Sequence, residues 1–304
     1  MVSRRGRFAG PVAAVLLGAA LFAAAPVGAA SAASTPGISP SAGMPGTSTT
    51  GVPDGTALRV HEGDLKITVD GTVIDGYDIR GLVWVEAANV TIKNSIVRGR
   101  TVSANIGLVN AQSTKVKNLN IEFVELAPTT PQVYLTGIYG HDFTLRDTDI
   151  HHVVDAVHIL GNNVRVFRSW LHDLSHFEVD AQQNGGPTHD DDIQIQSGTG
   201  FWFKDNVISG AHNAAMQVTQ DRGAVSTILF ENNIVSGGSC SLNIAQKGKV
   251  TTAIPAVTIR NNNFGANQYN CNAIIDAGTL KTATITGNTR TDLKAIKIIS
   301  RTTA

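Results

Sequence analysis

Apolar and polar residues alternate along most of the chain, in short runs that pause at a turn-forming residue and then resume. NVTIKNSIV and FWFKDNVI show the pattern, and strict alternation of this kind is typical of β-strands. These runs occupy residues 89–97, 114–121, 143–150, 164–171, 201–208, 228–235, 257–264 and 282–288. A second short apolar run precedes each of them, at residues 82–85, 106–109, 136–140, 156–160, 192–196, 215–218, 241–245 and 273–276.

Aligning the repeats predicts two columns of equivalent positions. The residues expected to point inward are Ile92, Val116, Leu145, Val166, Phe203, Phe230, Ile259 and Ile285. The turn position holds mainly Asn, Asp and Gly, which tolerate left-handed backbone: Asn94, Asn118, Asp147, Arg168, Asp205, Asn232, Asn261 and Gly287. Short strands that repeat at intervals of roughly 20 to 40 residues indicate a solenoid. We therefore predict an all-β fold, a single-stranded right-handed parallel β-helix of about eight rungs that stack at about 4.8 Å.

One outward-facing column of the predicted sheet consists of amides and aromatic rings. It contains Trp84, Tyr139, His158, Gln194, Gln217 and Asn243, and a neighbouring column offers Gln196 and Thr219. Amides bond sugar hydroxyls and rings stack on apolar sugar faces, so this column predicts a groove for a polysaccharide. The alternative is that exposed strands are polar in any case, and that amide ladders stabilise themselves.

Acidic residues gather where two of these strands begin. Asp155 stands two residues before inward Val157 and Asp191 two before inward Ile193, so we expect the two carboxylates on adjacent rungs, with Asp190 and Asp192 beside them. Carboxylates this close share a proton or bind a cation. One hypothesis makes Asp155 and Asp191 the acid and base of glycoside hydrolysis. A second has Asp190, Asp191 and Asp192 hold Ca²⁺, and a third is a solvated acidic turn.

The longest interval between repeats contains an inserted loop, residues 174–192, and long loops in compact repeats usually bind or catalyse. Histidines are frequent in and around this loop: His151, His152, His158, His172, His176 and His189. We expect His158 to be catalytic, because it points outward between Tyr139 and Gln194. His189 and His212 are expected to bind substrate. Lys247 is a candidate base for β-elimination if its pKa is lowered, and the alternative is a surface lysine.

The chain divides into three parts by composition. Residues 1–33 have basic residues, an apolar run and small residues, which is typical of a secretory signal peptide. Residues 34–56 are rich in Ser, Thr, Pro and Gly and are expected to form a linker, followed by the β-helix domain at 57–304. Removing the three arginines of the signal leaves 24 − 3 = 21 basic against 24 acidic residues, a net charge of −3. We therefore expect an extracellular protein with no nucleic-acid partner and no membrane contact after signal removal, and we expect a monomer.

The two cysteines occupy equivalent positions of consecutive repeats, in GGSCSLNI and QYNCNAII. Adjacent rungs hold Cα atoms at a separation that suits a disulfide, and a secreted protein permits oxidation. We predict a Cys240–Cys271 disulfide.

The Asn-rich turns and the DIQIQ-type strands resemble the pectin-lyase-like superfamily of parallel β-helices, over roughly residues 65 to 290. The resemblance implies an active site where HDDDIQI falls. Polygalacturonase-like members imply an order that Asp155, Asp190, Asp191, His212 and Lys247 follow, although no arginine accompanies Lys247. Pectate-lyase-like members imply a calcium cluster at Asp190–Asp192 with a basic residue nearby.

We therefore expect a secreted enzyme that cleaves a polysaccharide, and we rank β-elimination first, with Lys247 or His158 as the base and Ca²⁺ at the three aspartates. The alternatives are a glycoside hydrolase that uses Asp155 and Asp191, and a non-catalytic carbohydrate-binding or cell-surface protein.

Overall fold

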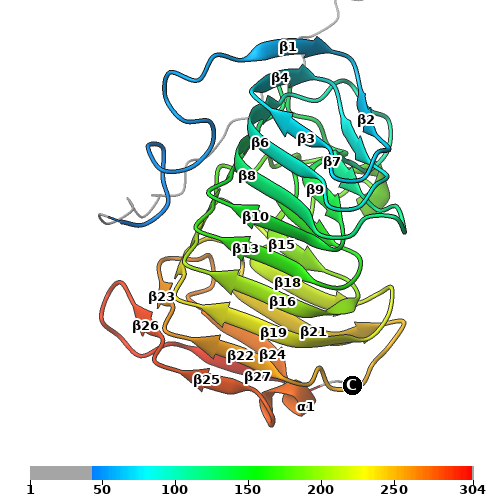
Figure 1. Cartoon of the computed structure of the whole chain (residues 1–304). Helices are drawn as coiled ribbons and strands as arrows, with labels where there is room; N and C mark the ends of the chain where they lie inside the picture. The colour runs from blue at the N-terminus through cyan, green and yellow to red at the C-terminus, as the bar shows by residue number, and fades with distance from the viewer. Residues whose placement is uncertain (1–42, 303–304) are drawn as a thin grey trace, which may run out of the picture.

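The computed structural model describes residues 43–302 and contains two long sheets in which every strand pairing is parallel. The larger sheet has 17 strands: β1 Arg59–Glu62, β3 Val73–Asp75, β4 Tyr77–Arg80, β6 Thr91–Val97, β8 Leu119–Leu126, β10 Phe143–Arg146, β11 Asp149–Ile150, β13 Val164–Phe167, β14 Trp170–Leu171, β16 Gly198–Lys204, β17 Val207–Ile208, β19 Val225–Glu231, β20 Ile234–Val235, β22 Val257–Arg260, β23 Asn263–Phe264, β25 Thr284–Thr286 and β26 Thr289–Arg290. Its strands stack from β1, drawn in blue, to β25 and β26 toward the red end of the colour scale in Figure 1.

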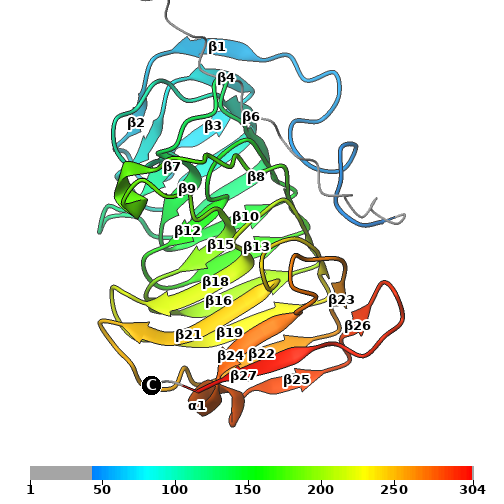
Figure 2. The same cartoon turned by 180° about the vertical axis from the view of Figure 1, so that it is seen from behind.

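The smaller sheet has 10 strands and faces the viewer in Figure 2: β2 Leu65–Ile67, β5 Val83–Val85, β7 Ile106–Ala111, β9 Leu135–Gly140, β12 Val157–Ile159, β15 Asp191–Ile195, β18 Ala214–Gln220, β21 Leu242–Gly248, β24 Ala273–Asp276 and β27 Ile298–Arg301. Helix is confined, in the described residues, to the 3-10 turn η1 Ala181–Gln183 and α1 Ala277–Leu280. The predicted all-β parallel fold is thus confirmed. The smaller sheet has two strands more than the eight predicted, β2 and β27. The prediction missed them because they are short and lie at the two ends of the sheet, where the repeat pattern is weak.

The core lies between the two sheets and is filled by the inward column. Ile92 pairs with Ile121, which pairs with Leu145, and the column continues in register through Phe203 and Phe230. The prediction was wrong at one rung, where Ile121 and not Val116 occupies the column. Both residues are fully buried, because the chain turns between them and each has its own place in the core.

The turn column adopts the expected left-handed backbone, with one exception at the same rung. Asn94, Asp147, Arg168, Asp205, Asn232, Asn261 and Gly287 all have positive φ. Asn118 also has positive φ (52°), but it belongs to the preceding turn, and Phe123 (φ 53°) takes the equivalent position after Ile121. A phenylalanine in this region is unusual, so the sequence signal was misleading here.

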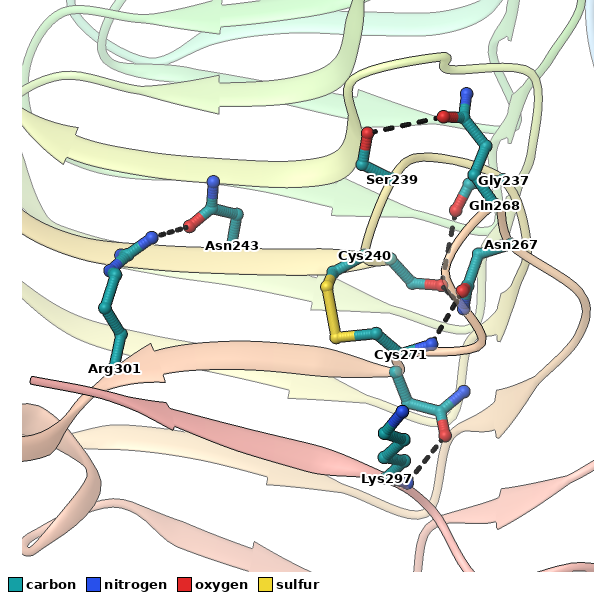
Figure 3. Close-up of a disulfide and its surroundings, with 11 residues drawn as sticks. Gly237, Ser239, Cys240, Asn243, Asn267, Gln268, Cys271, Lys297 and Arg301 are labelled. Atoms are coloured by element: carbon teal, nitrogen blue, oxygen red, sulfur yellow. Dashed lines mark hydrogen bonds between the residues drawn. A yellow bond between two sulfur atoms is a disulfide. The ribbon is translucent and has the colours of Figure 1, made fainter.

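The predicted Cys240–Cys271 disulfide is present, with the two Cα atoms 4.7 Å apart (Figure 3). It joins the segments just before β21 and β24, which pair in the small sheet. The predicted signal, residues 1–33, lies outside the described residues. In the described part of the expected linker, Thr50 is buried and the Gly51 N–H donates to the Asp147 carbonyl (2.9 Å), so this part packs on the strands.

Candidate functional site

The two carboxylates expected on adjacent rungs do lie side by side, at the start of β12 and β15. These strands pair in register, with Val157 opposite Ile193 and His158 opposite Gln194. The backbone N–H of Asp191 donates to Asp155 Oδ1 (3.1 Å), and the Ala156 N–H donates to the Asp191 carbonyl (3.1 Å). The repeat register therefore brings together residues that are 36 positions apart.

His158 and Asp155 form a bonded pair. His158 Nδ1 lies 2.9 Å from Asp155 Oδ2, and the imidazole meets the Tyr139 ring edge-on at 4.5 Å between centroids. Since the carboxylate accepts the Nδ1 proton, the lone pair of the neutral ring is on Nε2. His158 Nε2 is buried and has no hydrogen-bond partner within residues 43–302. A buried, oriented imidazole with an unused nitrogen is the arrangement of a general base.

A polar pocket of about 240 Å³ opens over this pair. Asp155, His158, Gln194 and Gln196 line it from the sheet side, and the inserted loop contributes Asp180, Gln182, Gln183 and His189. The loop is tied down where Asn105 Nδ2 donates to Gln182 Oε1 (2.7 Å), and Asp180 caps the turn η1 through the Gln182 N–H (2.8 Å). The loop side of the pocket is therefore held in place, and it presents the amides of Gln182 and Gln183 to the same pocket that His158 lines.

Asp191 is fully buried and does not line the pocket. Its Oδ1 accepts from Asn213 Nδ2 (2.8 Å), whereas Oδ2 has no partner among the described residues. Burial, reinforced by the negative charge of Asp155, raises the pKa of Asp191 well above its usual value. Asp191 therefore holds a proton at a pH where an exposed aspartate is ionised.

Asp190 has very different surroundings. Its oxygens accept from His176 Nδ1 (2.7 Å), His212 Nδ1 (2.9 Å), the His212 backbone N–H (2.6 Å) and the Thr188 hydroxyl (3.2 Å). Burial opposes ionisation, but the bonds from His212 and His176 outweigh it, so the pKa of Asp190 lies below its usual value. The same bond to Asp190 raises the pKa of His212. Thus His212 contacts the acidic turn. We expected His212 to bind substrate, but it does not line the pocket.

The donor set at the three aspartates does not fit Ca²⁺. A calcium ion takes six to eight oxygen ligands, but Asp190 is surrounded by imidazoles and one Asp191 oxygen faces an amide N–H. Asp192 is consecutive with Asp191 in β15, so the two side chains leave the strand on opposite sides. Both Asp192 oxygens are buried without a partner in the described structure, and burial raises its pKa well above the usual value.

The predicted outward column is in register along the small sheet. His158 lies opposite Gln194, Gln194 opposite Gln217, and Gln217 opposite Asn243. Asn110 separates Trp84 from Tyr139, a member that the sequence pattern missed. The column is therefore a continuous row of amides that leads away from His158.

Arg222 is a residue that alternation could not find, because it follows β18 in a turn. Its Nε donates to Gln196 Oε1 (2.9 Å) and its Nη2 to the Tyr139 hydroxyl (3.3 Å). It is exposed, and these two bonds place a guanidinium next to the amides and the tyrosine that meets His158. The only local signal was the turn sequence QDRG after a polar strand.

Lys247 lies apart from this pocket. It is exposed and lines a second cavity, of about 570 Å³, together with Asp276 and Arg301. Arg301 also reaches Asn243, donating from Nη1 to Oδ1 (3.1 Å), as Figure 3 shows. Arg301 is also ion-paired with Asp276, and Lys247 is not placed to act with His158.

No protein-family model, no curated protein and no solved structure matches this chain. Within residues 43–302, none of the helices is long and apolar enough to cross a membrane.

Proposed function

We propose that the protein is a secreted polysaccharide lyase, and that it folds as a right-handed parallel β-helix of the pectin-lyase-like kind. The stacked parallel sheets and the repeat support the fold, and the Cys240–Cys271 disulfide is consistent with an oxidising, extracellular location. One observation carries the function: His158 lines a polar pocket, is bonded to Asp155 through Nδ1, and has a buried Nε2 without a partner among the described residues.

β-Elimination begins when a base removes the proton next to a sugar carboxylate. His158 Nε2 takes this proton, and Asp155 stabilises the imidazolium that forms. The C–H electron pair becomes the new C=C bond while the bond to the leaving glycosidic oxygen breaks, and solvent returns a proton to that oxygen. A substrate made of uronic acids meets the need for the carboxylate, and Arg222 offers a positive charge to pair with it.

The row of amides gives this site its length. A sugar chain that lies along Gln194, Gln217 and Asn243 exchanges hydroxyl-to-water bonds for hydroxyl-to-amide bonds on successive rungs. Such contacts hold the chain in one register, so that a single C–H lies at His158. The preorganised alignment is worth more to the reaction than any one hydrogen bond.

Glycoside hydrolysis is a second candidate, and the raised pKa of Asp191 favours it. A carboxyl group whose pKa is raised by burial keeps its proton to a higher pH than an exposed aspartate, which is a property of a general acid. Hydrolysis would require Asp191 to turn out of its fully buried position, whereas His158 already lines the pocket. For this reason we place elimination first.

The test is to incubate the purified mature protein with a panel of plant, algal and bacterial polysaccharides, with and without a chelator. Unsaturated product absorbs in the ultraviolet, whereas hydrolysis yields reducing ends without absorbance. We expect absorbance that His158→Asn abolishes. The matched control is His141→Asn, because His141 is bonded to Asp142 and does not line the pocket.

Reducing ends without absorbance would assign the protein as a hydrolase. Glycan binding with no product across the panel would replace the enzyme by a carbohydrate-binding protein. Absorbance that the chelator removes while the protein stays folded would show a metal requirement of the reaction and would overturn the metal-free route given above.

A further inference from the structure

We infer that Glu125, Asp149, His151 and His172 form a zinc site, on the large sheet and outside the pocket of His158. Their strands are consecutive in the stack. Glu125 in β8 lies opposite Asp149 in β11, and Asp149 lies opposite Trp170 in β14. His151 and His172 each follow two residues after these positions, so they share the same face.

The donor atoms of these side chains converge. His172 Nε2 lies 2.8 Å from Asp149 Oδ1, and His151 Nε2 lies 3.6 Å from Glu125 Oε1. The donor atoms of Asp149, His151 and His172 all lie within 4.8 Å of one another. Four ligands at bond lengths of about 2.0–2.1 Å around zinc stand roughly 3.3 Å apart, and the two pair distances of 2.8 Å and 3.6 Å lie on either side of this value. Glu125 reaches the group of three through His151. Small side-chain shifts would complete a tetrahedron.

The outer nitrogens of both histidines already have partners. His172 Nδ1 is bonded to Asp173 Oδ2 (2.8 Å), and His151 Nδ1 is bonded to His152 Nδ1. Histidines that bind a metal almost always donate their second N–H to a carboxylate, a carbonyl or water, and Asp173 is such a partner for His172. The neighbouring imidazole of His152 takes this place for His151 and likewise leaves its Nε2 for the ion. Trp170 stacks on the His172 ring at 3.5 Å and fixes its orientation. The arrangement around the four ligands is therefore that of a prepared metal site.

The chemistry of the four groups selects zinc. Glu125 and Asp149 are like charges directly opposite each other in a sheet, which is unfavourable without a cation between them. Two imidazoles in the set favour zinc over calcium or magnesium. Two histidines and two carboxylates fill all four positions, so the ion would have a structural role.

The site lies beneath the N-terminal segment. A Cβ on Gly51 would lie 3.2 Å from Asp149 Cβ and 3.8 Å from Glu125 Cβ, so this segment packs directly against the two carboxylates. An ion here would join three rungs of the large sheet at the place where the N-terminal segment crosses them.

The experiment uses the full mature chain, treated with EDTA and returned to metal-free buffer. Co²⁺ is titrated as the spectroscopic probe and Zn²⁺ by calorimetry, and thermal unfolding is recorded with and without Zn²⁺. We expect the intense visible absorption of four-coordinate Co²⁺, its displacement by Zn²⁺, and a higher Tm with Zn²⁺. His151→Gln and Asp149→Asn should abolish all three effects.

Two further variants keep the test decisive. Asp173 is exposed, so Asp173→Asn preserves the fold, and it should weaken binding 10- to 100-fold without changing the Co²⁺ spectrum. His212→Gln removes a member of the other histidine–aspartate group, His176, Asp190 and His212, and should bind as the wild type does.

Three results would overturn the proposal. Absence of Co²⁺ binding in the wild type would show that protonated histidines alone neutralise the carboxylates. The weak spectrum of six-coordinate Co²⁺ would indicate a hydrated surface ion. Loss of binding in His212→Gln, with binding retained in His151→Gln, would move the metal to the other group.

Discussion

Two regions of this protein bury polar side chains, and they differ in whether those side chains have hydrogen-bond partners. In the large sheet, Asn206, Asn233 and Asn262 form a ladder that ends at Asn288. The Asn206 backbone N–H and Nδ2 both donate to Asn233 Oδ1 (3.0 Å each), and Asn233 repeats this toward Asn262 (2.9 Å each). Each Nδ2 also donates to a carbonyl of the core strands, such as that of Phe203 (3.0 Å). The side-chain oxygen of each asparagine thus accepts hydrogen bonds from the asparagine of the preceding rung.

At the start of β12 and β15, several buried polar atoms lack a hydrogen-bond partner among the described residues. His158 Nε2, Asp191 Oδ2 and both Asp192 oxygens have no hydrogen-bond partner in the part of the chain that the structure describes. An unsatisfied buried polar group costs about 1–3 kcal/mol of folding free energy. These groups therefore lower the stability of the fold, whereas the asparagine ladder supports it. The contrast separates polar residues that build the solenoid from those that are available for chemistry.

Removing the base should give the largest effect. In His158→Asn we expect kcat/KM to fall by about 10²–10⁴, which is the usual contribution of general base catalysis. The free energy of unfolding should change little, because the asparagine can still donate to Asp155. Steady-state kinetics on the best polysaccharide of the panel, together with urea unfolding, measures both. Equal losses of activity and stability would mean that His158 belongs with the structural ladder.

Breaking the ladder should give the converse result. Asn233→Ala leaves the Asn206 backbone N–H without an acceptor, removes one of the two acceptors of Asn206 Nδ2, and leaves the Phe203 carbonyl without its side-chain donor. The free energy of unfolding should fall by about 2–4 kcal/mol, while activity per folded molecule is retained. Urea unfolding with an activity assay in native buffer tests this. A loss below about 0.5 kcal/mol would contradict a supporting role for the ladder.

The dependence of stability on pH should identify the buried carboxyl group. Burial raises the pKa of Asp191, so between the unfolded value of 3.8 and the folded pKa the native state binds more protons than the unfolded state. The stabilisation is complete below pH 3.8 and is lost as the pH rises through the folded pKa. Asp191→Asn removes this loss, so the variant should gain stability relative to the wild type as the pH rises.

Urea unfolding at several pH values, with EDTA present, measures this difference. A constant difference between variant and wild type would show that Asp191 ionises normally. The same variant also separates the two reactions, since elimination should survive Asp191→Asn and hydrolysis should not.

The smallest effect is expected within the amide row. Gln217 lies in the amide row between Gln194 and Asn243, and its buried Oε1 has no partner among the described residues. Gln217→Leu should raise KM by about 3- to 10-fold, the value of one hydrogen bond, and should stabilise the free protein slightly. Kinetics and thermal unfolding of the one variant test both. An unchanged KM would remove Gln217 from the proposed groove.

Much of this arrangement could be predicted because the repeats are local signals. Alternation with period two located both sets of strands, and the repeat register placed Asp155 beside Asp191 and Cys240 beside Cys271. The rung at 114–121 was misaligned because Val116, like Ile121, is an apolar residue two positions before a turn residue. Only the strand pairing of Ile121 with Ile92 decides which of the two belongs to the inward column.

The surroundings of each charged side chain could not be predicted in the same way. DDD in the sequence suggested one cluster, but Asp190 is bonded to His176 and His212, Asp191 to Asn213, and Asp192 to none of the described side chains. Arg222 reaches Tyr139 across 83 positions of sequence. Contacts of this kind depend on side-chain directions in three different rungs.

The sequence by itself determined that the chain forms parallel strands, where it turns and which rungs are neighbours, because backbone pairing and burial follow a short period that is repeated many times. Only the tertiary structure decided which buried polar groups are satisfied and which are not. Hydrogen bonding and pKa shifts depend on the few ångströms between side chains of adjacent rungs, and no periodic pattern specifies that distance.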